Sequence, residues 1–184
     1  MTTAAPIVLT SQRNLVLIGY RASGKTMVGR ELARRLGRPF VDLDQVLVAE
    51  AGEAIAPLVA REGWAEFRRR EKALVTRYAA MAGQVLAPGG GVVLDPENAR
   101  VLREHGVVIW LAAAPPVLRE RLGRDGATAA NRPGLTAADP LAEVELVLRE
   151  REPLYRQAAD LVVDTTALSP EEVADRILEA VTGG

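Results

Sequence analysis

Two patterns alternate along the chain: short runs of apolar residues, and longer stretches in which apolar residues recur every three or four positions. The short runs predict buried strands at residues 15–18, 40–42, 85–87, 107–111 and 161–164. The longer stretches predict helices at residues 25–36, 65–81, 96–104, 116–122, 141–159 and 170–181. Strands that alternate with helices in this way indicate a parallel sheet covered by helices on both faces.

Glycine and proline mark the expected interruptions of this pattern. The helical region that follows residue 42 should be interrupted near Gly52 and Pro57 and again near Gly63. The helix over residues 141–159 should break at Pro153, because proline removes a backbone hydrogen bond from a helix interior.

The alternation predicts a single α/β domain over residues 1–184, built as a three-layer α/β/α fold around a central five-stranded parallel sheet. Residues 1–12 are expected to be flexible. Residues 123–138, rich in Gly, Ala, Asn and Pro without periodicity, are expected to form a mobile loop. Ligands of such sheets bind where the carboxyl ends of strands meet the amino ends of helices, so the candidate chemistry should lie along that edge.

Composition narrows the functional class. The chain is 48% hydrophobic and 26% charged, with a net charge of -1, which argues against a nucleic-acid binder that relies on a positive field. It contains no cysteine, so neither a disulfide framework nor the usual kind of zinc site is expected. The first twelve residues lack the pattern of a secretion signal, and no apolar run approaches the roughly 20 residues of a membrane span. A cytoplasmic enzyme without a membrane or nucleic-acid partner is therefore the expectation.

The strongest local signal is Gly19–Thr26, which matches G-x-x-x-x-G-K-[ST] between a predicted strand and a predicted helix. A loop of this kind turns its backbone N–H groups inward around phosphate oxygens. Lys25 should reach the β- and γ-phosphates, and Thr26 should bind Mg²⁺. Lysine is otherwise found only at Lys72, so Lys25 is unusual in this arginine-rich chain. The predicted nucleotide-binding residues of the loop are Gly19, Ala22, Ser23, Gly24, Lys25 and Thr26. The motif is shared by GTPases, helicases and metabolite kinases, so it does not identify the phosphate acceptor.

Further motifs at separated places carry a family resemblance. They are GYRASGKTMVG at residues 19–29, FVDLD at 40–44, FRRRE at 67–71, GGG at 89–91, RP at 132–133 and REPLY at 151–155. In this order and spacing the chain resembles the shikimate kinase family. The resemblance implies a P-loop kinase fold with a lid over residues 123–138 and an acceptor-binding helical segment over residues 43–81. It also implies the use of ATP and Mg²⁺ to phosphorylate the 3-hydroxyl of shikimate, a step of aromatic amino acid biosynthesis.

The resemblance also implies roles for individual residues. Asp42 would help Thr26 to hold Mg²⁺, often through water, as suits a hard cation. Asp44 would bind the acceptor hydroxyls and accept the proton, although it could instead cap a helix that begins at Gln45. Arg132 would close from the lid onto the transferring phosphoryl group, so that Lys25, Asp44 and Arg132 form the predicted catalytic set.

On the acceptor side, Arg68 and Arg151 resemble the pair that binds the carboxylate of shikimate, a geometry suited to planar guanidinium groups. Glu71 would orient Arg68. Gly89, Gly90 and Gly91 would border the pocket, because glycine lets a ligand approach the backbone closely. The adenine side is poorly marked, with Arg124 and the turn at residues 167–170 as its candidates. Trp64, Trp110 and Tyr155 are expected to pack without binding a ligand, and His105 to lie at the surface without chemistry.

Two alternatives to a shikimate kinase stay open from the sequence alone. One is another small-metabolite kinase of the same fold, of which a gluconate kinase is the hardest to separate because gluconate also carries a carboxylate. The other is a nucleotide-binding regulator without catalysis, against which the intact Asp44, Arg68 and Arg151 speak. The expected partners are small molecules, ATP and shikimate, and the expected state is a monomer.

Overall fold

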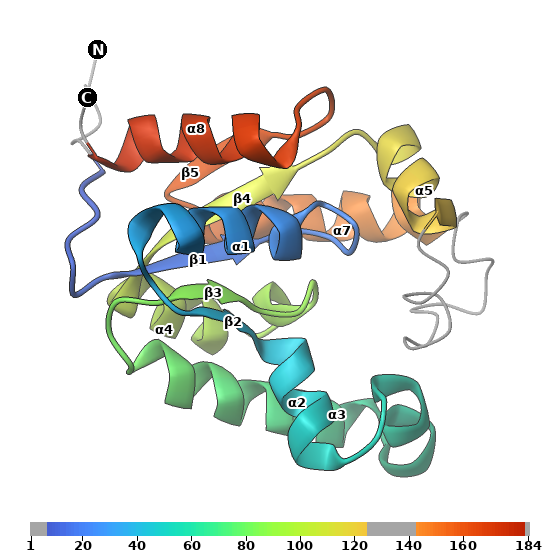
Figure 1. Ribbon diagram of the computed structural model, residues 1–184. Helices are drawn as coiled ribbons and strands as arrows, with labels where there is room; N and C mark the ends of the chain where they lie inside the picture. Colours follow the sequence, from blue (N-terminus) through green and yellow to red (C-terminus); the bar gives the residue numbers. More distant parts are fainter. Residues whose placement is uncertain (1–6, 125–142, 183–184) are drawn as a thin grey trace.

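The computed structural model describes residues 7–124 and 143–182 and contains the five-stranded parallel sheet that the sequence predicts. The strand order is β2-β3-β1-β4-β5, and every neighbouring pair is parallel (Figure 1). The strands are β1 (Asn14–Ile18), β2 (Phe40–Asp42), β3 (Val85–Ala87), β4 (Gly106–Ala112) and β5 (Leu161–Asp164). All five strand predictions are confirmed.

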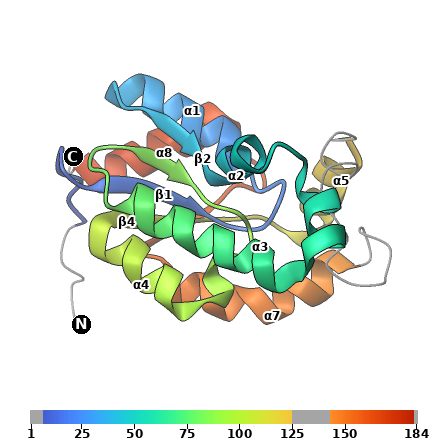
Figure 2. The ribbon, with the colours of Figure 1, turned by 90° about the horizontal axis from the view of Figure 1, so that it is seen from below.

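Helices cover both faces of the sheet, which completes the three predicted layers (Figures 1 and 2). One face packs against α1 (Lys25–Leu36) and α8 (Pro170–Thr182). The other packs against α3 (Ile55–Ala79), α4 (Pro96–His105) and α7 (Glu143–Ala158). Residues alternate between the two cores along β1: Leu15 and Leu17 belong to the first, Val16 and Ile18 to the second. The remaining elements are α2 (Leu43–Ala51), α5 (Pro115–Arg124) and the short 3-10 helix η1 (Val92–Leu94).

The interruptions predicted near Gly52 and Pro57 and again near Gly63 are confirmed, whereas the break predicted at Pro153 is wrong. Gly52 ends α2 in the left-handed conformation, and Gly63 kinks α3 with φ 83° and ψ 165°. Pro57 lies in the first turn of α3, where backbone N–H groups have no partner within the helix to lose. Pro153 lies inside α7, which continues from Glu143 to Ala158. Burial of side chains on both sides of Pro153 holds the helix together despite the missing hydrogen bond.

Helix ends differ from the predictions by a few residues. α3 ends at Ala79 rather than residue 81. α5 continues through Arg124, so the predicted loop cannot begin at Gly123, and residues 125–138 lie outside the described part of the chain. Among the described residues, no helix combines the length and the apolar character that crossing a membrane requires.

Candidate active site

The phosphate-binding loop between β1 and α1 depends on an unusual backbone. Gly19 has φ 144° and Gly24 φ 99°, and Ala22, with φ 61°, has the only positive φ among the described non-glycine residues. A side chain at Gly19 would be 2.6 Å from the carbonyl oxygen of Leu111. Backbone of this kind forms concave nests of N–H groups that bind anions.

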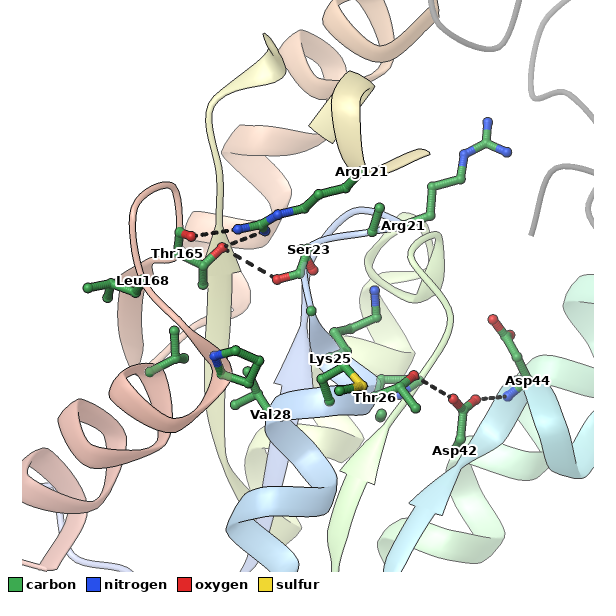
Figure 3. A pocket seen from close by; sticks show the side chains of 17 residues that line it. Arg21, Ser23, Lys25, Thr26, Val28, Asp42, Asp44, Arg121, Thr165 and Leu168 are labelled. Atoms are coloured by element: carbon green, nitrogen blue, oxygen red, sulfur yellow. Dashed lines mark hydrogen bonds between the residues drawn. The ribbon is translucent and has the colours of Figure 1, made fainter. Parts of the chain in front are cut away.

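Lys25 lies in a cavity of about 360 Å³ that opens beside the loop (Figure 3). Its Nζ donates to the carbonyl oxygens of Gly19 at 2.8 Å and Tyr20 at 2.9 Å. The cavity is also lined by Arg121, Thr165, Leu168, Pro170 and Val173, and the Thr165 hydroxyl donates to the Ser23 carbonyl oxygen of the loop at 3.4 Å. A cavity of this size, with a lysine and a helix amino end at one side, suits a nucleotide.

Asp42 joins the loop to the neighbouring strand. The Thr26 hydroxyl donates to Asp42 Oδ2 at 3.0 Å, as Figure 3 shows. Asp42 Oδ1 accepts from the backbone N–H groups of Asp44 at 3.1 Å and Gln45 at 3.3 Å, so Asp42 caps α2. The alternative in which Asp44 caps this helix is therefore wrong. Asp44 instead lines the cavity.

The cavity is also lined by an arginine that the sequence pattern did not indicate. Arg121 of α5 donates to Thr165, from Nη2 to the carbonyl oxygen at 2.8 Å and from Nη1 to Oγ1 at 3.2 Å. Arg124, the predicted residue, is 78% exposed at its side chain and pairs with Glu120 at 2.6 Å. It is not among the described residues that line the cavity. Both arginines lie in the last turn of α5, and only the orientation of the helix separates them.

A second pocket adjoins the first and shares Arg21 and Asp44 with it. Its lining brings together all the predicted acceptor residues, Asp44, Arg68, Gly89, Gly90, Gly91 and Arg151, together with Glu71, the predicted partner of Arg68. Arg68 Nη1 donates to Glu71 Oε2 at 2.6 Å. Burial raises the pKa of the Glu71 carboxyl, against the opposing effect of the Arg68 guanidinium. Glu71 therefore holds Arg68 from a nearly solvent-free position, as the sequence analysis predicted.

The three glycines of the second pocket are required by close approach, since none has a positive φ. A Cβ at Gly89 would be 2.7 Å from Asp44 Oδ1 and 3.0 Å from Glu71 Oε1. A Cβ at Gly91 would collide with the guanidinium of Arg68. The triplet thus lets two carboxyl groups and an arginine converge on one stretch of backbone.

Two aromatic residues pack against residues of the second pocket. Tyr155 is buried and stacks on Trp110 with ring centroids 5.8 Å apart, which confirms its packing role. Its hydroxyl also donates to the Gly90 carbonyl oxygen, and burial raises its pKa to about 12, so it stays protonated as a donor. Trp64 packs edge-on against Phe67 at 5.5 Å and lines the second pocket, with the Arg68 guanidinium 5.5 Å from its ring. Arg132, the predicted lid arginine, lies outside the described residues.

A protein-family model described as shikimate kinase matches residues 21–182, which is most of the chain. The chain belongs to the shikimate kinase family. A shikimate kinase of Syntrophus aciditrophicus is 44% identical over 174 residues, covering 90% of this chain and 89% of that protein. One of Symbiobacterium thermophilum is 46% identical over 166 residues, covering 90% and 94%. The solved structure of an Acinetobacter baumannii shikimate kinase in complex with shikimate matches with a TM-score of 0.85 at 32% identity, covering 92% of each chain.

Family membership confirms three predictions. The fold is that of a P-loop kinase, and the protein is an ATP-dependent kinase whose acceptor is a small-molecule alcohol. Shikimate kinase is the activity that the relatives share, whereas neither a gluconate kinase nor a non-catalytic regulator is favoured. The roles of individual residues are a separate question, which the geometry of the two pockets addresses.

Proposed function

We propose that the protein transfers the γ-phosphate of ATP to the 3-hydroxyl of shikimate, and that Asp44 is the residue at which the two substrates meet. The observation that carries this proposal is the shared wall of the two pockets, to which Asp44 contributes on both sides. A triphosphate in the first pocket and a hydroxyl in the second would approach one another there. Transfer of this kind is accelerated mainly by alignment and by neutralisation of charge.

The first pocket would hold ATP by its phosphates. The loop N–H groups around Ala22, Ser23 and Gly24 would bind phosphate oxygens, and Lys25 would neutralise the β- and γ-phosphates. Arg121, rather than the exposed Arg124, is our candidate for the contact with the base. Its guanidinium is held by Thr165, which lines the same cavity and whose hydroxyl donates to the Ser23 carbonyl oxygen of the phosphate loop at 3.4 Å.

Mg²⁺ fits the residues at the loop. Thr26 Oγ1 and Asp42 Oδ2 are 3.0 Å apart and are oxygen donors, the kind that a hard cation prefers. Among the described residues no group of three or more His, Cys, Asp or Glu side chains could hold a metal. This suits Mg²⁺, which keeps several waters and binds substrate phosphates together with one or two protein ligands. When bound, Mg²⁺ would neutralise phosphate charge.

The second pocket would hold shikimate by its carboxylate. Arg68 and Arg151 line one pocket from different helices, so two guanidinium groups can fix both the charge and the orientation of an acid. Asp44 would accept the proton of the 3-hydroxyl as the oxygen bonds to the γ-phosphorus. The bond from this phosphorus to the bridging oxygen then breaks, and ADP leaves. Arg132 stays a prediction, as the arginine that covers the transferring group.

The expected monomeric state and cytoplasmic location are likewise part of this proposal. The net charge of -1 and the described fold, with one continuous sheet, are compatible with a single chain that acts on diffusible metabolites. Light scattering after gel filtration should give the mass of one chain, 19.7 kDa. A mass of two chains would contradict the monomer without affecting the proposed chemistry.

The test of the proposed function is acceptor-dependent release of ADP from ATP and Mg²⁺. Shikimate, gluconate and a nucleoside monophosphate should be compared as acceptors, with a reaction that lacks any acceptor as the control for ATP hydrolysis. Shikimate should be the preferred acceptor, and the product should carry phosphate on its 3-oxygen by ³¹P and ¹H NMR. A higher kcat/KM for gluconate, or nucleotide binding without turnover on any acceptor, would contradict the proposal.

A further inference from the structure

Helix α7 holds the tip of the phosphate loop. The guanidinium of Arg21 pairs with the carboxylate of Glu143, the first residue of α7, and the two side chains are 9% and 0% exposed. The preceding residue, Tyr20, is buried in one apolar cluster with Val144 and Val147 of the same helix. The loop is therefore attached to α7 by both a charge pair and apolar packing.

The same helix also holds the acceptor pocket. Further along α7, Arg151 Nη1 donates to the Gly90 carbonyl oxygen at 3.3 Å, and the Tyr155 hydroxyl donates to the same oxygen. Gly90 in turn lies against the phosphate loop, where a Cβ would be 3.3 Å from both Arg21 N and Gly19 O. Phosphate loop, glycine triplet and α7 thus form a closed circuit of contacts between the two pockets.

The Arg21–Glu143 pair fixes the position of α7 relative to the phosphate loop, but it adds little to the free energy of unfolding. A buried ion pair contributes little net stability, because removal of two charges from water offsets their attraction. Separation of the two groups is nevertheless costly, since each buried charge would lose its opposite charge. A shift of the loop at Arg21 therefore carries Glu143, and with it α7, along.

Lys25 is the residue through which bound nucleotide would act on these contacts. Its Nζ donates to the carbonyl oxygens of Gly19 and Tyr20, the two residues that immediately precede Arg21. Phosphate oxygens that bind Lys25 compete with these two carbonyl oxygens for the N–H donors of Nζ. We therefore expect bound phosphate to shift the loop backbone next to Arg21. Figure 3 shows the Arg21 guanidinium directed away from Lys25, and its partner Glu143 belongs to α7.

We propose that Arg21 and Glu143 are positioning residues that couple the two pockets, so that bound nucleotide raises the affinity for the acceptor carboxylate through α7 and Arg151. The proposal rests on the function proposed above, because it takes ADP and shikimate as the two ligands. Coupling of this kind is reciprocal: shikimate must raise the affinity for nucleotide by the same factor. Glu143 is not among the described residues that line either pocket, whereas its partner Arg21 lines both.

The test is calorimetric titration of shikimate with and without saturating ADP and Mg²⁺. The wild-type Kd for shikimate should fall by about fivefold or more when ADP is present, the range of ordinary coupling between sites. In Glu143→Gln this ratio should approach one. Glu145→Gln is the matched control, because Glu145 lies two residues further along α7 and pairs with Arg119 at 3.0 Å between exposed side chains. Its ratio should equal that of the wild type.

A double variant, Arg21→Met with Glu143→Leu, keeps the test decisive if Glu143→Gln does not fold. It removes both charges together, an exchange that buried ion pairs often tolerate. The melting temperature should then stay near that of the wild type while the ADP-dependent ratio is lost. A ratio that stays at the wild-type value in the double variant overturns the coupling. A wild type that binds shikimate equally with and without ADP overturns the coupling alone, whereas absence of shikimate binding in both states contradicts the proposed function as well.

Discussion

The nucleotide cavity and the acceptor pocket share Asp44, yet they are assembled in opposite ways. One side of the first cavity is lined by eight consecutive residues, 21–28, from the phosphate loop and the start of α1. The acceptor pocket takes its charged side chains from the loop, α2, α3 and α7, between residues 21 and 151 of the sequence, and the glycine triplet borders it. One site is thus a local structure, and the other exists only when distant elements are packed. Single substitutions should therefore affect the two substrates separately, because each pocket depends on different contacts.

The largest effect should come from the nucleotide side. Lys25→Ala removes the positive charge that would face the β- and γ-phosphates, so kcat should fall by at least about 10²-fold. The measurement is ADP release with saturating ATP and shikimate. Lys72→Ala is the control that the chain offers, since Lys72 is its only other lysine and pairs with Asp95 at 2.9 Å on the surface. Near-normal turnover of Lys25→Ala would contradict the assignment of the phosphate cradle.

The acceptor side should respond separately. Arg151→Ala should raise the KM for shikimate by about 10- to 100-fold, since hydrogen bonds to charged groups contribute roughly 1.5–3 kcal/mol. The Kd for ATP, measured by titration without shikimate, should change little. Arg156→Ala is the control on the same helix, because Arg156 is exposed and pairs with Glu152 at 3.1 Å. Loss of ATP affinity with an unchanged KM for shikimate would show that Arg151 does not bind the carboxylate.

The difference in assembly also explains how much the sequence could predict. The loop and β1 were predictable because a contiguous motif with a buried strand before it carries all the information. The rotation of α5, which selects Arg121 over Arg124, depends on packing that no local pattern records. The pair of Arg21 with Glu143 spans 122 residues and has no signature in either segment.

The prediction of a helix break at Pro153 was wrong for the same reason. Local rules for proline describe its cost to an isolated helix, which is about 3 kcal/mol in a helix interior. The helix around Pro153 is instead held by Arg151, Tyr155 and Ala158, which are buried against the sheet and the glycine triplet. Tertiary packing outweighs the local penalty here, and it is this packing that places Arg151 in the lining of the second pocket.

A smaller effect should follow from crowding the triplet. In Gly91→Ala the new methyl group meets the Arg68 guanidinium, which can move because it is the end of a flexible side chain. The KM for shikimate should rise about fivefold, equivalent to roughly 1 kcal/mol, while the KM for ATP stays unchanged. The matched control is Gly123→Ala in α5, where a Cβ meets nothing within 4 Å. If both variants have wild-type kinetics, the close approach of Arg68 to Gly91 is not needed for acceptor binding.

The smallest effect concerns the pH dependence of stability, and it probes the acceptor side alone. Burial raises the pKa of Glu71 above its ordinary value of 4.5, despite the nearby Arg68 and Arg151, and the carboxylate of Asp44 acts in the same direction as burial. Between 4.5 and the raised value, the folded protein binds more protons than the unfolded chain. The free energy of unfolding must therefore fall as pH rises through this window, by about 1.4 kcal/mol for each pH unit that separates the folded and unfolded pKa values. Glu71→Gln removes this contribution.

Thermal melts of the wild type and of Glu71→Gln from about pH 5 to pH 8 should therefore diverge, because the stability of the wild type falls relative to that of the variant as pH rises. Glu66→Gln on the same helix is the control, because the pKa of Glu66 is lowered whereas that of Glu71 is raised. Arg69 and Arg70 lower the pKa of the half-buried Glu66 to about 2, so its contribution is lost only as pH falls below 4.5. The difference between the wild type and Glu66→Gln should stay flat over the same range. Parallel curves for the wild type and Glu71→Gln would mean that Glu71 is ionised over this whole pH range, so that a full charge pair holds Arg68 at every pH measured.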